Sequence, residues 1–134
     1  MNFAAGDAKK APMIGYTSLD MTRCGPVTRL TLNRPARRNA LTHAMMLELE
    51  HAFGAVRADA DCRVLVLRGA GGHFCAGGDF DAMADMLFRS ANGADDPLVP
   101  AYRQFGDALL TLNTLSQATI SVVEGSAVGG GFGM

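Results

Sequence analysis

The stretch TISVVEGSAVGGGFGM, residues 119–134, decides the fold. Its first half is an apolar run typical of a buried strand, and it leads directly into a glycine cluster. A junction of the same kind occurs earlier, where RVLVLRG at residues 63–69 leads into AGGHFCAGGDF. Such continuous, valine-containing apolar runs predict strands buried on both faces, which favours a parallel sheet. We therefore expect the two glycine-rich loops to follow neighbouring parallel strands.

The other elements alternate between strands and helices. VTRLTLN at residues 27–33 predicts a strand, and the apolar spacing over residues 42–58 predicts an amphipathic helix with Thr42 as its N-cap. A short helix is expected over DAMADMLF, residues 81–88, and a longer one over roughly 98–117. With the two buried strands and a final helix after the last glycines, this order predicts an α/β fold.

Length and composition set limits on the class of protein. The 134 residues suit one domain, and an apolar content of 49% allows a substantial core. A net charge of −1 argues against a nucleic-acid surface, and no apolar run is long enough for a membrane span. Residues 1–12 predict a flexible lead-in to a domain over residues 13–134, without a secretory signal. The scattered cysteines Cys24, Cys62 and Cys75 predict free thiols and a cytoplasmic protein.

The glycine clusters do not fit the common phosphate-binding motifs. A P-loop that starts at Gly125 would place Gly131 where a lysine is required. The dinucleotide motif G-x-G-x-x-G ends in Phe74 when it starts at Gly69, and in Met134 when it starts at Gly129. Tight turns or close helix–sheet packing remain an alternative explanation of the glycines.

Backbone N–H groups offer a functional explanation of the same loops. A helix start leaves N–H donors unpaired and carries partial positive charge, and glycine lets a ligand oxygen approach them. Two such starts on neighbouring parallel strands would direct two donors at one point, which is an oxyanion hole. The chemistry served would be a carbonyl whose oxygen gains negative charge, as in an enolate or a tetrahedral intermediate.

Three blocks of sequence carry a family resemblance. LTLNRPARRNAL at residues 30–41, HFCAGGDF at 73–80 and ISVVEGSAVGGGFGM at 120–134 together resemble the enoyl-CoA hydratase/isomerase (crotonase) family. The resemblance covers roughly residues 13–134 and about the first half of a typical member. It implies a ClpP/crotonase spiral of repeated strand–strand–helix units that is incomplete at the C-terminus. It also implies an acyl-CoA enzyme of fatty acid metabolism, forming a homotrimer or hexamer at full length.

The resemblance also implies a set of site residues. The backbone N–H groups of Ala76 and Gly130 would hold the thioester oxygen and stabilise an enolate. A coenzyme A thioester would be the substrate, with no separate cofactor and no metal. Its binding residues would be Arg37, Arg38, Ala40, Ala76, Gly77, Gly78, Asp79, Gly129 and Gly130. Guanidinium groups suit the phosphates of coenzyme A, although the two arginines could equally be solvated loop residues.

One position departs from the family pattern. Gly133 stands where hydratases of the family commonly carry a glutamate, and the second glutamate would lie beyond Met134. Hydratase, isomerase, dehalogenase and other hydrolase chemistry therefore all remain open. A truncated or pseudo-enzyme fragment that acts as an interaction module is the alternative from another class.

Several other residues have both a structural and a functional interpretation. The acidic residues Asp79, Asp81 and Asp85 suit the first turns of a helix, although Asp81 or Asp85 could serve as a base. We expect Cys75 to be a packed thiol rather than a nucleophile. The histidines His43 and His51 are expected to be exposed, and no spacing supports a metal site. Glu124 is expected to be a structural hydrogen-bond acceptor, with a catalytic base as the alternative.

Overall fold

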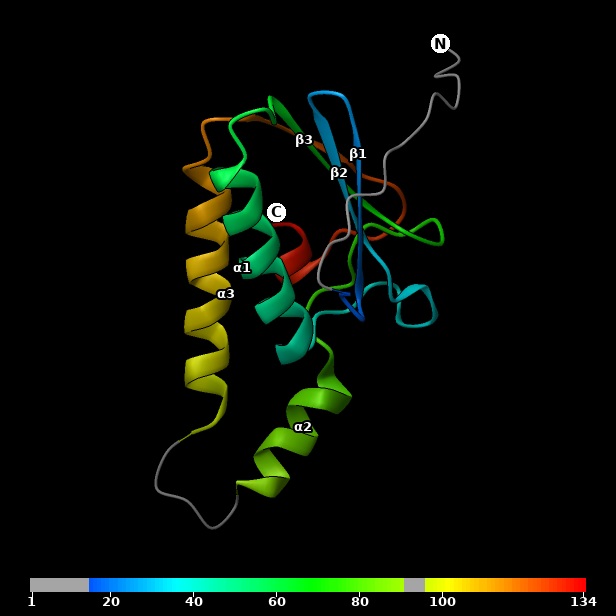
Figure 1. The fold of residues 1–134 in the computed structure, drawn as a ribbon. Helices are drawn as coiled ribbons and strands as arrows, with labels where there is room; N and C mark the ends of the chain where they lie inside the picture. The colour runs from blue at the N-terminus through cyan, green and yellow to red at the C-terminus, as the bar shows by residue number, and fades with distance from the viewer. Residues whose placement is uncertain (1–14, 91–95) are drawn as a thin grey trace.

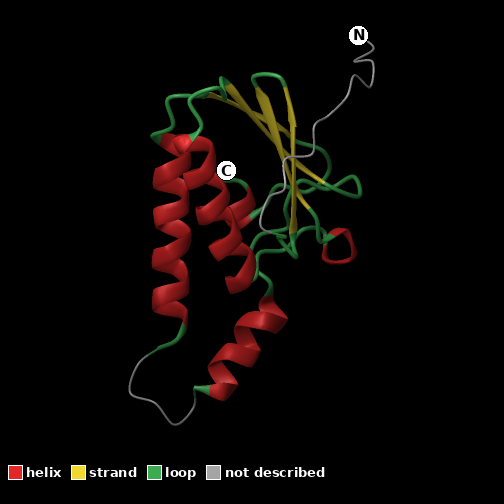
Figure 2. Cartoon of the chain, viewed as in Figure 1, coloured by secondary structure: helices red, strands yellow, loops and turns green. Residues whose placement is uncertain are grey.

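The computed structural model describes residues 15–90 and 96–134, so the predicted lead-in over residues 1–12 lies outside the described residues. Helices and strands alternate along most of the chain, as the sequence predicts (Figures 1 and 2). The elements are β1 (Leu19–Cys24), β2 (Val27–Leu32), η1 (Pro35–Arg37), α1 (His43–Ala58), β3 (Val64–Gly69), α2 (Phe80–Arg89), α3 (Leu98–Asn113), β4 (Ala118–Val122) and η2 (Gly129–Gly131).

The described strands form one sheet in the order β1-β2-β3-β4. β1 and β2 form an antiparallel hairpin, whereas β2, β3 and β4 run parallel. α1 connects β2 to β3, and α2 and α3 connect β3 to β4. The carboxyl ends of β3 and β4 consequently lie at the same edge of the sheet, and both glycine-rich loops start there.

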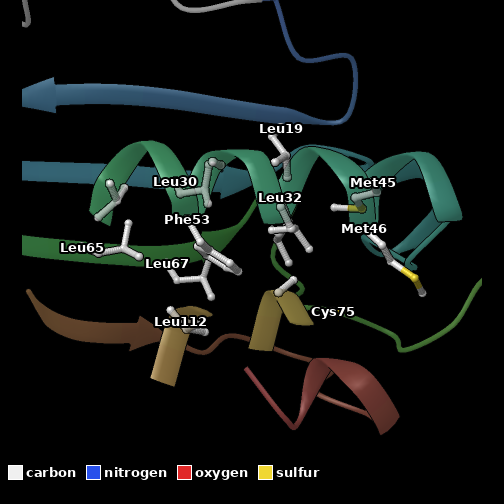
Figure 3. Close-up of a cluster of buried hydrophobic side chains, with 14 of the residues drawn as sticks. Leu19, Leu30, Leu32, Met45, Met46, Phe53, Leu65, Leu67, Cys75 and Leu112 are labelled. Carbon is white, nitrogen blue, oxygen red and sulfur yellow. The ribbon is translucent and has the colours of Figure 1, made fainter. Parts of the chain in front are cut away.

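The hydrophobic core lies between α1 and the sheet, with α3 packed beside α1 (Figures 1 and 3). Alternate residues of the strands face this layer, because strand side chains point to opposite faces in turn. Leu30 and Leu67 are register partners, and both are buried. From α1, Met45, Leu49 and Phe53 enter the same core at helical spacing. Thr42 is the N-cap of α1, as predicted, and its side chain accepts a hydrogen bond from the N–H of Met45 at 3.2 Å.

β1 was not predicted from the sequence, and Glu48 of α1 explains how its start is held. The Glu48 carboxylate accepts hydrogen bonds from the backbone and side chain of both Thr17 and Ser18, at 2.6–3.0 Å. Burial alone would raise the pKa of Glu48, but these four hydrogen bonds lower it below its ordinary value. β1 therefore depends on contacts with a residue 30 positions away, which local periodicity does not reveal.

The end of the chain differs from the prediction in three ways. β4 is exposed along its whole length, although its apolar sequence predicted burial, because it is the edge strand of the described sheet. α3 ends at Asn113, so the predicted helix over 98–117 is too long at its C-terminal end. The expected final helix is the three-residue 3-10 turn η2.

Candidate active site at the paired glycine loops

The two glycine-rich loops pair with each other beyond the ends of β3 and β4. The N–H of Phe74 donates to the carbonyl of Glu124 at 2.7 Å, and that of Cys75 donates to Ser126 at 2.8 Å. The N–H of Val128 returns a bond to the carbonyl of Cys75 at 3.0 Å. The predicted neighbouring arrangement of the two loops is therefore confirmed.

A third segment, which follows η1, lies against the first loop. The N–H of Leu41 donates to the carbonyl of Gly77 at 2.7 Å, and the N–H of Asp79 donates to the carbonyl of Leu41 at 2.9 Å. These two bonds fix the backbone on either side of Gly78. The position of Gly78 thus depends on the β2–α1 connection as well as on its own loop.

The side chain of Asn39 joins the β2–α1 connection to the first glycine loop by hydrogen bonds. Asn39 was not identified as a candidate residue from the sequence. Its buried side-chain amide donates to the carbonyls of Ala70 at 2.9 Å and His73 at 2.7 Å, and accepts from the N–H of Arg34 at 2.8 Å. Its φ angle of 57° lies in the left-handed region, which asparagine adopts more readily than most residues. That preference is the sequence signal that could have identified it.

The backbone hydrogen bonds correct the predicted first donor. The N–H of Ala76 donates to the carbonyl of Arg38 at 3.0 Å, so it is not available to a ligand oxygen. The backbone of Gly77 hydrogen-bonds the thiol of Cys75, and the N–H of Asp79 is bonded to Leu41. None of the hydrogen bonds among the described residues uses the N–H of Gly78. Gly78 therefore replaces Ala76 as the candidate donor of the first loop.

The second loop leaves its own donors free beside the first. The N–H groups of Gly129 and Gly130 begin η2, and neither has an acceptor within the described part of the chain. A Cβ atom on Gly77 would lie 2.8 Å from the carbonyl oxygen of Val128, so the two loops touch. A Cβ atom on Gly130 would lie 3.0 Å from Cδ1 of Leu41, the residue bonded on both sides of Gly78. Gly130 thus faces the segment that holds Gly78.

An apolar cavity opens beside Gly78. It has a volume of about 210 Å³ and lies between the start of α1, α2 and the start of α3. Gly130 is not a lining residue, but a Cβ atom there would lie 3.0 Å from Cδ1 of Leu41, which is one. Apolar side chains dominate the wall, and three of them are methionines, which adapt to irregular shapes. The lining residues are Leu41, Thr42, His43, Met46, Gly78, Phe80, Ala82, Met83, Met86, Leu98, Ala101 and Tyr102.

Gly78 also lines a second space, a groove that contains two arginines. The groove has a volume of about 360 Å³ and brings together six of the predicted substrate-binding residues: Arg37, Arg38, Ala40, Ala76, Gly78 and Asp79. Gly77, Gly129 and Gly130 do not line it. Gly78 and Phe80 line both the groove and the apolar cavity. The two spaces therefore meet at the candidate donor.

Asp79 is the centre of a charge network rather than a free ligand group. Its carboxylate, only 3% exposed, accepts hydrogen bonds from Arg34 at 2.9 Å and Arg37 at 3.1 Å. It also caps α2 by accepting from the N–H of Ala82 at 3.3 Å, in agreement with the predicted helix-start role. Burial alone would raise the pKa of Asp79, but these hydrogen bonds and the charge of Arg37 lower it. Arg37 also pairs with Asp81.

Replacing Asp79 by asparagine is expected to destabilise the fold in a pH-dependent way. The loss at pH 7 should be about 2 kcal/mol, since the variant forfeits charge-assisted hydrogen bonds. The pKa of Asp79 is lower in the folded than in the unfolded protein. Its ionised carboxylate therefore stabilises the fold above the unfolded-state pKa of about 3.9, and this stabilisation is lost as pH falls through the folded-state pKa. Urea unfolding at several pH values should therefore show the difference from wild type shrinking below about pH 4.

A matched control for this prediction is Asp85→Asn. Asp85 is exposed and forms an i,i+4 pair with Arg89 on α2, so the change should cost under about 0.5 kcal/mol. An Asp79→Asn loss that stayed constant from pH 6 to pH 3 would contradict the assigned role of the carboxylate.

The remaining predicted candidates have structural surroundings. Cys75 is buried, which raises its pKa, and its thiol donates to the carbonyl of Asn39, so the packed-thiol prediction is confirmed. His51 is exposed, as expected, whereas His43 is half-buried and lines the apolar cavity. Glu124 is exposed and forms an ion pair with Arg68 at 3.7 Å rather than accepting a side-chain hydrogen bond. No cluster suited to a metal ion occurs among the described residues.

Comparisons with known proteins place this chain in a family. Residues 27–134 match the family model described as enoyl-CoA hydratase/isomerase. The chain is 40% identical over 109 residues to enoyl-CoA hydratase EchA19 of Mycobacterium tuberculosis (strain ATCC 25618 / H37Rv), covering 81% of this chain and 40% of that protein. It is 31% identical over 128 residues to mitochondrial Delta(3,5)-Delta(2,4)-dienoyl-CoA isomerase of Homo sapiens, covering 91% of this chain and 39% of that protein.

Solved structures agree with the sequence comparison. Pseudomonas aeruginosa AtuE superposes with a TM-score of 0.78 at 45% identity, over 86% of this chain and 43% of that chain. An enoyl-CoA hydratase/isomerase from Marinobacter aquaeolei superposes with a TM-score of 0.77 at 43% identity, over 87% of this chain and 44% of that chain. The parallel strands and paired loops are thus those of a crotonase fold, as the resemblance implied.

The chain belongs to the enoyl-CoA hydratase/isomerase family. It spans about 40% of the length of the curated relatives it matches. None of the helices within residues 15–90 and 96–134 has the length and apolar character needed to cross a bilayer.

Proposed function

We propose that these residues bind an acyl-CoA thioester and stabilise its enolate through the N–H groups of Gly78 and Gly130. The observation that carries the proposal is the position of Gly78, where the apolar cavity and the arginine-containing groove meet. An acyl group suits the cavity and a phosphate-bearing group suits the groove, so the thioester carbonyl would lie at the glycine between them. The free N–H of Gly78 is then available to its oxygen.

Arg38 is the better candidate than Arg37 for a phosphate ligand. Arg37 is paired with Asp79 and Asp81, whereas the exposed Arg38 side chain has no partner among the described residues. The φ angle of Arg38 is 47°, in the left-handed region that costs most residues energy. Strained backbone of this kind tends to persist at ligand sites, which supports a binding role.

The chemistry would centre on charge that develops on the thioester oxygen. Donors held rigidly by the surrounding backbone stabilise an enolate more than they stabilise the ground-state carbonyl. Gly133 cannot transfer a proton, so the acid or base that distinguishes hydration from isomerisation lies elsewhere. We propose an enoyl-CoA hydratase or isomerase that uses the coenzyme A thioester as substrate and no resident cofactor. A homotrimer or hexamer in the cytoplasm is part of the same proposal.

A binding comparison tests whether the acyl group lies in the apolar cavity and the phosphates lie in the arginine-containing groove. The natural polypeptide that contains residues 1–134 is titrated with crotonyl-CoA and with the N-acetylcysteamine thioester of crotonate, which lacks the nucleotide phosphates. Arg38→Ala is expected to weaken binding of crotonyl-CoA about five- to tenfold, since a charge-assisted contact is lost. Binding of the short thioester should not change.

The control for Arg38→Ala is Arg89→Ala, which removes an exposed arginine of α2 that lines neither space. Equal weakening of both thioesters by Arg38→Ala would contradict the groove as the phosphate site. Failure of the wild-type protein to bind either thioester would contradict the proposed function itself. Turnover of crotonyl-CoA and of a 3-enoyl-CoA then separates hydratase from isomerase.

A further inference from the structure

A chain of hydrogen-bonded polar side chains, called the relay below, reaches the wall of the largely apolar cavity. His43, at the start of α1, lines the cavity, and its Nε2 lies 3.1 Å from Oε1 of Gln104 on α3. The side-chain Nε2 of Gln104 donates in turn to the carboxylate of Glu50 at 2.8 Å. The relay therefore links α1 to α3 beside the cavity.

The chemistry of the relay fixes the tautomer of His43. An ionised glutamate only accepts hydrogen bonds, so the amide nitrogen of Gln104 must face Glu50. The amide oxygen of Gln104 then faces His43, and this oxygen only accepts. The proton of the neutral imidazole consequently lies on Nε2, and Nδ1 is the acceptor. Nδ1 has no partner among the described residues.

The other polar side chains on the wall offer less to a ligand. The hydroxyl of Thr42 already accepts from the N–H of Met45 as the N-cap of α1. The hydroxyl of Tyr102 lies 4.0 Å from the sulfur of Met83, which is a weak acceptor. An apolar cavity with a few placed polar groups is the usual design of a site that selects one ligand orientation. His43 differs from them because the hydrogen bond from its Nε2 to Gln104 leaves Nδ1 as an acceptor for a ligand.

We propose that His43 is a specificity-determining residue that selects acyl groups bearing a hydroxyl on the part of the chain that occupies the apolar cavity. The hydroxyl donates to Nδ1 of His43, and Gln104 and Glu50 act as positioning residues that hold the neutral imidazole in the tautomer with its proton on Nε2. The proposal rests on the proposed function, since it takes the apolar cavity as the acyl site. A pocket built to hydrogen-bond a substrate hydroxyl discriminates strongly against the analogue that lacks it.

The test compares two substrates that differ by one oxygen. Dissociation constants and kcat/KM are measured for hex-2-enoyl-CoA and 6-hydroxyhex-2-enoyl-CoA with the natural polypeptide that contains this segment. The wild-type protein is expected to prefer the hydroxylated substrate at least tenfold, and His43→Leu to reduce that ratio to about one. His51→Leu, a change of the exposed histidine on the same helix, should leave the ratio unaltered.

A second variant keeps the test decisive if His43→Leu fails to fold. Gln104→Leu leaves the imidazole in place but removes the oxygen that holds the proton on Nε2, so Nδ1 is no longer fixed as the acceptor and the ratio should fall toward one. Equal use of both substrates by the wild-type protein, or an unchanged ratio in both variants, would overturn the inference and leave the proposed function intact. Absence of binding of both substrates would overturn the proposed function and the inference together.

Discussion

The variant Gly130→Pro is expected to lose turnover of the proposed acyl-CoA substrate by a factor of about 10²–10³ relative to Gly130→Ala. Proline lacks the N–H that we assign to the thioester oxygen, whereas alanine keeps it. Loss of a single oxyanion donor costs about 2.7–4 kcal/mol of transition-state stabilisation. The measurement is kcat/KM, which reports that loss directly.

Gly130→Ala is the matched control because both variants introduce the same Cβ atom. That atom would lie 2.9 Å from Cε1 of Phe105 and 3.0 Å from Cδ1 of Leu41, so both variants crowd the same side chains. Gly130 is the middle residue of the 3-10 turn η2 and does not have a positive φ, and the ordinary φ of such a turn is close to the angle of about −65° that proline requires. Thermal unfolding of both variants checks that the fold persists. Turnover of the proline variant within threefold of the alanine variant would show that this N–H is not a donor.

The variant Gly69→Ala is expected to cause the largest loss of stability. A Cβ atom on Gly69 would lie 1.9 Å from the carbonyl oxygen of His73 and 2.5 Å from that of Phe74. Both are backbone atoms, so the first glycine loop must move rather than a side chain. The same Cβ atom would lie 2.7 Å from Nδ2 of Asn39, whose hydrogen bonds join the β2–α1 connection to this loop. We expect the free energy of unfolding to fall by at least about 3 kcal/mol in urea denaturation.

Gly54→Ala provides the opposite result under the same assay. Gly54 lies within α1, and no heavy atom would lie within 4 Å of a Cβ atom added there. Alanine should therefore stabilise the protein by about 1 kcal/mol through its higher helix propensity. A loss below about 1 kcal/mol for Gly69→Ala would mean that the close approach of this loop is not a constraint on the fold.

The parts of the fold that the sequence predicted have local signals. α1 was predicted within one residue because its apolar spacing and its cap residue Thr42 agree. β2 and β3 follow from short apolar runs that end in proline or glycine. The pairing of the two glycine loops followed from a general rule, since the carboxyl ends of neighbouring parallel strands meet at one edge of a sheet.

The parts that the sequence did not predict depend on distant partners. The start of β1 is held by hydrogen bonds to Glu48, and the side-chain amide of Asn39 donates to backbone carbonyls more than 30 positions away. The choice of oxyanion donor depended on which backbone N–H groups already form hydrogen bonds within the fold. The resemblance pointed to Ala76 as the donor, and the hydrogen bond from the N–H of Ala76 to the carbonyl of Arg38 is what moves the assignment to Gly78.

The most direct test of the central claim is the carbonyl stretching frequency of a bound thioester. Crotonyl-CoA labelled with ¹³C at the thioester carbonyl is bound to the protein, and its isotope-edited infrared spectrum is compared with that of the free ligand. Two N–H donors on the oxygen predict a bound frequency well below the free value, with part of that shift lost in Gly130→Pro or Gly78→Pro and kept in Gly78→Ala. A bound frequency equal to the free value in the wild-type protein would contradict the account.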